Sequence, residues 1–249
     1  MVQNLINFVK GDIIGASFEM KPTPITKLDT SLIAEGIWTD DTSQMLCVID
    51  ALLNSSNKEE FITIFKSNLI NWFDKGLYTK KGKAVGYGST TKNAIKSIKD
   101  NEEVLNTKLS SGALMRVAPF LFTHSKYLDY LPELIKVTHR NPEHLRYIFY
   151  YLSLYRSDIL ISSPVEKKED SWIRNNPDDI LYFIEKNTNK KDIEFLCNLT
   201  EDGGDTDTVL ALQGALKDEE FLPTISIEIP KEVLDMFSKF KTWIDEQNS

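Results

Sequence analysis

Two short polar turns in the sequence each place two aspartates among threonines, directly before an apolar helical pattern. Residues 38–46 read WTDDTSQML, and residues 203–212 read GGDTDTVLAL. Aspartate and threonine are favoured helix caps, so capping alone accounts for any single one of these residues. A cap needs only one oxygen acceptor, however, whereas each turn offers four oxygen-bearing side chains. The surplus oxygens call for a second use.

Clustered carboxylates repel one another unless a cation lies among them. Hard divalent cations such as Mg²⁺ bind aspartate oxygens, hydroxyls and water. If the two helix starts meet, they offer enough oxygens for two cations about 4 Å apart. An EF-hand beginning at Asp205 is excluded, because its sixth and twelfth positions require Gly and Glu but hold Leu210 and Leu216.

The remaining motifs are less specific. The stretch GYGSTT at residues 86–91 lacks the third glycine of a dinucleotide fingerprint, and the sequence has no Gly-Lys-Ser/Thr phosphate loop. It is either a flexible turn or a place where backbone amides approach a diphosphate. The three histidines, His124, His139 and His144, do not have the spacing of a zinc site.

The composition favours a folded, acidic protein. The 249 residues include 37 acidic and 29 basic side chains, which gives a formal net charge of −8, and 41% of residues are hydrophobic. Because nucleic acids are bound by clustered Lys and Arg, this balance argues against a nucleic acid as the primary partner. No apolar run approaches the roughly 18 residues of a membrane span, and the N-terminus lacks a signal-peptide pattern. With only Cys47 and Cys197, which read as buried free thiols, we expect a cytoplasmic protein.

Helical periodicity dominates the elements that must position these residues. Apolar residues recur at helical spacing in 45–53, 61–69 and 143–155. No repeat or long linker divides the chain, so we expect one compact all-α domain over residues 1–249. The segments 194–199, 208–216 and 233–243 also read as helices, 225–229 as a short extended piece, and 162–179 as a polar surface loop.

Six ordered sequence blocks span about residues 11–216. They are GDIIGASFE from Gly11, WTDDTSQML from Trp38, GYGSTTKNAI from Gly86, SGALMRVAPF from Ser111, THRNPE from Thr138 and GGDTDTVLALQGAL from Gly203. In this order the blocks resemble those of the ADP-ribosylglycohydrolase family. The resemblance implies an all-helical single domain with a binuclear Mg²⁺ or Mn²⁺ centre at helix N-termini.

The resemblance also implies roles for individual residues. Thr39, Asp40 and Asp41 would hold one metal, and Asp205, Asp207 and Thr208 would hold the other or bridge the two. Glu19 would lie beside the metals, so that Glu19, Asp40, Asp41 and Asp207 carry the catalysis. The implied substrate-binding residues are Gly86, Gly88, Ser89, Gly112, Ala113, Met115 and His139.

The implied reaction is metal-dependent hydrolysis of the bond between ADP-ribose and a modified protein side chain. Its transition state has oxocarbenium character and needs a negative field, an activated water and an oriented sugar. We expect a monomer that acts on ADP-ribosylated proteins or related conjugates and releases ADP-ribose. The alternatives are a catalytically inert ADP-ribose-binding descendant and, less favoured without a basic phosphate-facing motif, a phosphoryl hydrolase.

The sequence departs from the family pattern in places that bear on specificity. Ser110 and Ser111 stand where family members usually have Gly-Asn, and the chain is shorter between the Thr-His block and GGDTD. The acceptor residue on the target protein therefore stays open. Arg116 could clamp a phosphate, but its position in an apolar block favours a structural role.

Overall fold

The computed structural model describes residues 1–21, 24–25, 33, 36–166 and 172–247, and within these ranges the fold is all-helical. This confirms the predicted fold class. Its α-helices are α1 (Val2–Ala16), α2 (Asp40–Leu53), α3 (Lys58–Lys75), α4 (Ser89–Lys99), α5 (Leu131–Lys136), α6 (Glu143–Ser153), α7 (Pro177–Asn187), α8 (Asp192–Asp202), α9 (Thr206–Ala215) and α10 (Lys231–Gln247), with 3₁₀ segments at Ser111–Ala113, Met115–Leu121 and Ser125–Tyr130.

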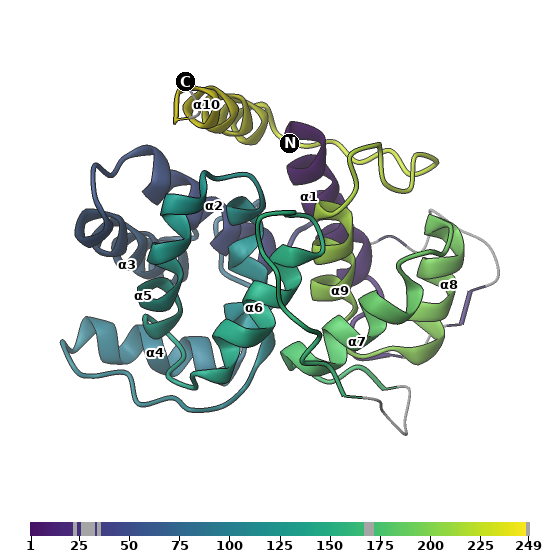
Figure 1. Ribbon diagram of the computed structural model, residues 1–249, viewed down its shortest axis with the longest axis horizontal. Coiled ribbons are helices and arrows are strands. Elements are labelled where there is room, and N and C mark those ends of the chain that lie inside the picture. The colour runs from purple at the N-terminus through teal and green to yellow at the C-terminus, as the bar shows by residue number, and fades with distance from the viewer. Residues whose placement is uncertain (22–23, 26–32, 34–35, 167–171, 248–249) are drawn as a thin grey trace.

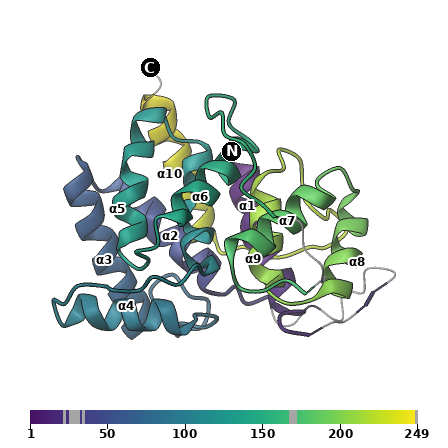
Figure 2. The same cartoon turned by 60° about the horizontal axis from the view of Figure 1, so that its bottom comes forward.

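Helices α1 and α9 lie side by side at the centre of the molecule (Figures 1 and 2). Glycines on α1 allow this close approach, because a Cβ atom at Gly11 would collide with the backbone of Leu210, and one at Gly15 with the backbone of Asp207. The pair is held further by the hydroxyl of Thr206, which donates to the carbonyl oxygen of Gly15 at 2.8 Å. The start of α9 is thereby fixed against the end of α1.

Two groups of helices flank the central pair. Helices α2 to α5 lie on one side and α7 and α8 on the other, while α10 covers the ends of α1 and α2 (Figure 1). The buried apolar side chains form one continuous core, which includes the fully buried Trp72 and Phe61 of α3 and Phe237 of α10. No helix in the described ranges is both long and apolar enough to cross a membrane.

The helix boundaries correct three sequence expectations. Residues 225–229 form no strand; the one β-bridge in the described chain joins Ile173 to Gly204. Residues 162–179 are not all loop, because α7 begins at Pro177 with Asn176 as its cap; residues 167–171 lie outside the described chain. The GYGSTT stretch is a turn only as far as Gly88, because Gly88 is the N-cap of α4 and the following residues belong to that helix.

Candidate active site

The two aspartate turns meet in the folded chain. The hydroxyl of Thr208, at the start of α9, lies 3.4 Å from Oδ2 of Asp41, at the start of α2. One carboxylate oxygen each from Asp12, Asp41 and Asp207 lies within 4.8 Å of the others. All of these side chains are buried, so three carboxylates converge in the interior.

Backbone geometry aims each turn at this point. Thr39 is the N-cap of α2, which places Asp40 and Asp41 in the first helical turn. Asp205 is the N-cap of α9 but makes no capping hydrogen bond to the helix backbone. Its carboxylate hydrogen-bonds the side chains of Thr208 and Ser111 instead. The amide of Asp205 donates to the carbonyl oxygen of Ile173 at 3.0 Å, which ties the turn to the segment before α7.

Asp12, on α1, is the residue of this cluster that sequence reasoning missed. Its carboxylate accepts the amide and hydroxyl of Thr39, and the amide and hydroxyl of Thr42. With its acceptor sites filled by these donors, Asp12 serves to anchor the start of α2 and adds negative charge beside Asp41. Its only sequence signal was its place within the GDIIGASFE block.

Burial and mutual repulsion raise the pKa values of these carboxylates. Burial, followed by the negative charges of Asp207 and Asp12, raises the pKa values of Asp40 and Asp41 well above the ordinary range. The pKa of Asp207 is raised by burial and Asp205, and burial raises the pKa of Asp205 to about 6. Burial, Asp207 and Asp12 likewise raise the pKa of Glu19 to about 7. A raised pKa means that the charged form of a carboxylate is disfavoured, and a bound cation would stabilise that charged form.

Two oxygens in this cluster have no hydrogen-bond partner among the described residues. These are Oδ1 of Asp41 and Oδ2 of Asp205, and both are buried. An unpaired buried polar atom is costly, because it has lost its water without replacement. Hard oxygens left unpaired at the start of two facing helices fit divalent cations.

The cluster opens into a cavity of about 390 Å³. Its lining combines carboxylates with hydroxyl, amide and ammonium groups. Its predicted lining residues are Glu19, Asp40, Asp41, Asp205, Asp207, Thr208, Gly86, Gly88, Ser89, Gly112 and Met115; sequence reasoning missed Met20, Thr90, Thr91, Lys108 and Asn175 and did not assign Ser110 or Ser111 to the site.

Three residues proposed from the sequence lie behind the cavity wall instead of on it. Thr39 directs its hydroxyl to Asp12, at 2.8 Å from Oδ1. Ala113 is fully buried in the core. His139 is 1% exposed and reaches the cavity only through Ser110, whose Oγ lies 2.9 Å from its Nε2.

Arg116 is fully buried and holds side chains behind the cavity, in keeping with the structural role that the sequence favours. Its Nη2 donates to Oε1 of Gln44 at 2.5 Å, and Nε2 of Gln44 donates to Oδ2 of Asp40 at 3.0 Å. Its Nη1 donates to the Thr138 hydroxyl at 2.7 Å. Burial lowers the pKa of Arg116 to about 10, so the side chain stays cationic at neutral pH.

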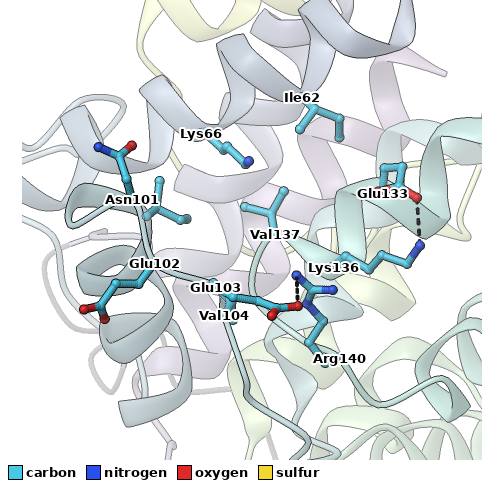
Figure 3. Close-up of a pocket in the computed structure, with 11 residues that line it drawn as sticks. Ile62, Lys66, Asn101, Glu102, Glu103, Val104, Glu133, Lys136, Val137 and Arg140 are labelled. Atoms are coloured by element: carbon cyan, nitrogen blue, oxygen red, sulfur yellow. Dashed lines mark hydrogen bonds and ion pairs between the residues drawn. The ribbon is translucent and has the colours of Figure 1, made fainter.

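A second cavity of about 360 Å³ lies beside α3, α4 and α5 (Figure 3). Four of its charged side chains pair with each other: Lys136 contacts Glu133 at 2.8 Å, and Arg140 contacts Glu103 at 3.2 Å. Among the described residues it shares no lining side chain with the acidic cavity. The chemistry is therefore concentrated in the acidic cavity.

Comparison with known proteins agrees with this architecture. ADP-ribosylarginine hydrolases named Tri1, from Serratia proteamaculans (strain 568) and Pseudomonas putida (strain GB-1), are each 29% identical to this chain over 97 residues, 36% of this chain and 26% of the relative. The match thus spans about a quarter of those relatives. A solved structure described as an ADP-ribosylglycohydrolase-related protein complex has a TM-score of 0.67 and covers 97% of this chain and 96% of its own, at 18% identity.

A family model described as ADP-ribosylglycohydrolase matches residues 6–157. The matched part holds Asp12, Glu19 and the first aspartate turn, whereas the turn at 205–208 lies beyond it. The structural likeness extends over both turns. The chain belongs to the ADP-ribosylglycohydrolase family.

Proposed function

We propose that the protein is a metal-dependent hydrolase that cleaves the glycosidic bond between ADP-ribose and a modified protein side chain, releasing ADP-ribose. The observation that carries this proposal is the pair of aspartate turns, which face each other with unpartnered oxygens on Asp41 and Asp205. Family membership and the names of the two hydrolases support reversal of ADP-ribosylation as the reaction class.

The residues proposed to hold two Mg²⁺ or Mn²⁺ ions are those at the two helix starts. Bound there, the cations would supply Lewis acidity toward ribose hydroxyls and a water of lowered pKa. The hydroxyl proton of Thr39 is engaged by Asp12, and its oxygen accepts the amide of Asp41 at 3.4 Å, which leaves one lone pair for a cation. The full set is Thr39, Asp40, Asp41, Asp205, Asp207 and Thr208.

The protein's own carboxylates supply the rest of the chemistry. A side chain whose pKa lies near neutrality is suited to accept a proton from an attacking water, and the pKa of Glu19 is raised to about 7 beside the cavity. Asp40, Asp41 and Asp207 place negative charge where an oxocarbenium-like ribose develops positive charge. Gly86, Gly88 and Gly112 also line the cavity, where the lack of a side chain lets the backbone approach a ligand.

The proposed setting is a monomer in the cytoplasm, acting on ADP-ribosylated protein and not on nucleic acid. The acidic balance of the chain, −8 overall, opposes binding to a phosphate backbone. Both cysteines are free, Cys47 buried and Cys197 half-buried, which suits a reducing compartment.

The test is a panel of peptides ADP-ribosylated on arginine, serine or cysteine, read by mass spectrometry with and without Mg²⁺. We expect release of free ADP-ribose from at least one peptide, and loss of release in EDTA and in Asp205→Ala. Glu133→Ala, which removes an acidic side chain outside the acidic cavity, is the matched control and is expected to keep full activity. Full activity in EDTA would overturn the metal mechanism, and ADP-ribose binding without turnover on any peptide would favour the inert alternative.

A further inference from the structure

The stretch of chain that borders the acidic cavity is rich in lysines that the proposed function does not use. Residues 75–99 hold seven of the 29 basic side chains and none of the 37 acidic ones, whereas the whole chain has a net charge of −8. A local charge opposite in sign to that of the whole chain points to a partner of the other sign. The seven lysines are Lys75, Lys80, Lys81, Lys83, Lys92, Lys96 and Lys99.

Three of these lysines interact within the chain. Lys80 donates to the carbonyl oxygen of Gly36 at 2.8 Å. Lys99 pairs with Asp74 at 2.8 Å, and Lys81 has a contact of its own. The other four are exposed and pair with no described residue, so their charges are available to a partner. We call these four the lysine surface: Lys75, Lys83, Lys92 and Lys96.

The lysine surface lies where α4 packs beside the end of α3 (Figures 1 and 2). The ring of Tyr87 lies 5.1 Å from that of Phe73, which holds the start of α4 against the last turn of α3. The loop between the two helices folds back on its own base, because a Cβ atom at Gly76 would lie 2.6 Å from the backbone nitrogen of Lys83. Lys75, next to Gly76, and Lys83 are therefore neighbours in space.

Helix electrostatics account for only part of this arrangement. Lys75 and Lys96 lie in the last turns of α3 and α4, where the negative end of a helix favours a cation. Lys92 is only the fourth residue of α4, at the positive end of that helix, and Lys83 belongs to no helix. Lys92 and Lys96 also share one exposed face, since they are four residues apart. Lys83 and Lys92 thus need a reason outside the helices.

These two lysines flank a segment of the acidic cavity in the sequence. Five of the six residues 86–91 line the cavity, and Lys92 follows them directly. Lys83 precedes Gly86 by three residues, which is at most about 11 Å of extended chain. A protein whose modified side chain enters the cavity brings the surface around that side chain close to both ammonium groups.

We propose that the lysine surface docks an acidic stretch of the ADP-ribosylated protein, close to its modified residue. This rests on the proposed function and names the charge of the protein substrate at the contact. Exposed ammonium groups attract carboxylates over several ångströms, and such pairs steer association and select partners more than they add affinity. The surface therefore favours targets with Asp or Glu near the modified side chain.

Protein carboxylates fit this surface better than a nucleic acid does. Residues 75–99 contain no arginine, the side chain that binds phosphate in a bidentate manner. The ring of Tyr87 packs against Trp72 and Phe73, so it does not stack on a base. A phosphate backbone that crossed the lysine surface would also meet the carboxylates of the adjoining cavity.

Peptide binding tests the lysine surface without requiring turnover. The probe is a short fluorescent peptide of Glu and Asp residues, without ADP-ribose, titrated with the Mg²⁺-loaded protein and read by anisotropy. We expect Lys83→Glu combined with Lys92→Glu to weaken binding by about tenfold, because two attractive contacts become repulsive. At about 0.1 M salt, where charges interact over about 10 Å, the original affinity also falls as more salt is added.

The matched control is Lys231→Glu combined with Lys239→Glu. These exposed lysines lie on α10, at the other end of the molecule from α4 (Figures 1 and 2). The control makes the same change in net charge and is expected to keep the affinity within about twofold. Equal losses in the two double variants would show that net charge alone attracts the peptide, and tighter binding of a single-stranded RNA than of the peptide would assign the surface to a nucleic acid. Either result overturns the proposal.

Turnover separates the lysine surface from the proposed function. Each ADP-ribosylated peptide of the panel is made with either acidic or basic residues beside the modified side chain. We expect a lower KM for the acidic version, and Lys83→Glu with Lys92→Glu removes this preference while kcat stays unchanged. Hydrolysis of both versions at the same KM would overturn the docking role and leave the proposed function intact. Lysine-dependent binding of the acidic peptide, with hydrolysis of no panel peptide, would contradict the proposed function alone.

Discussion

The carboxylate of Asp12 accepts hydrogen bonds from both the amide and the hydroxyl of Thr39, at 3.0 and 2.8 Å. The two residues lie 27 positions apart, on α1 and at the cap of α2. Because the same carboxylate also accepts the amide and hydroxyl of Thr42, it closes the first turn of α2 from outside. The orientation of Asp40 and Asp41 is consequently set by a residue that need not touch substrate.

We predict that Asp12→Asn lowers the free energy of unfolding by about 2 kcal/mol. Thr39 and Thr42 donate to both oxygens of Asp12. The asparagine side chain would replace one of these oxygens with an NH₂ group, which also donates, so at least one hydrogen bond becomes a repulsive contact. Urea denaturation measures the loss. Asp74→Asn, which breaks only the exposed contact to Lys99, is the control and changes stability by less than about 0.5 kcal/mol. Equal effects of the two substitutions would contradict an anchoring role for Asp12.

Sequence periodicity predicts the helices that bury one face. Helix α2 ends at Leu53 and α6 covers Glu143–Ser153, close to the predicted ranges, because apolar side chains in each line one stripe. Helix α1 is different: almost all of its residues from Leu5 to Gly15 are buried, so no polar face marks its period. The start of α7 is hidden for another reason, since its cap Asn176 and Pro177 are also typical of turns.

The same distinction applies to the site. The four aspartates of the two turns are visible in the sequence, because their oxygens exceed what helix capping needs. Asn175 gives no local signal, since it comes from a polar stretch that reads as loop and reaches the cavity only through tertiary packing. His139 shows the converse, because a motif resemblance identifies the residue but not that Ser110 stands between it and the cavity.

Gly86 cannot carry a side chain without disturbing the acidic cluster. Its φ of +88° is in the left-handed region, and a Cβ there would lie 2.7 Å from Oδ1 of Asp40. We predict that Gly86→Ala costs about 2 kcal/mol of stability and weakens Mg²⁺ binding in calorimetry. Gly88→Ala is the matched control, because its Cβ meets nothing within 4 Å. If both variants bind Mg²⁺ equally well, the contact between Gly86 and Asp40 has no bearing on the metal.

Added Mg²⁺ or Mn²⁺ should stabilise the protein. At a concentration about a hundred times Kd, the expected gain is about 2.7 kcal/mol, which raises Tm by roughly 5–10 °C for a chain of this size. Differential scanning fluorimetry with EDTA as reference measures the shift. No shift at any concentration would argue against the metal site.

Asp207→Asn separates metal binding from folding. We predict that it abolishes the Mg²⁺-dependent rise in Tm yet leaves the metal-free protein at least as stable as the original, because it removes a buried carboxylate that Asp205 and Asp12 repel. Glu133→Gln, outside the cavity, keeps the full metal-dependent shift. A metal-free Asp207→Asn protein that is much less stable would mean that the carboxylate serves the fold and not a cation.

The buried His139 should make stability depend on pH near neutrality. The pKa of His139 in the folded protein is lowered well below 6.5. Its contribution to the free energy of unfolding is therefore present above about pH 6.5. That contribution is lost as pH falls toward the folded pKa, because in this range the unfolded chain takes up a proton that the folded chain does not. We predict that the difference in unfolding free energy between the original protein and His139→Gln shrinks as pH falls from about 7 to about 5, by at most about 1.4 kcal/mol per pH unit. Urea denaturation in EDTA at each pH measures it. A difference that stays flat over this pH range would show that the imidazole of His139 is not held neutral between Thr138 and Ser110.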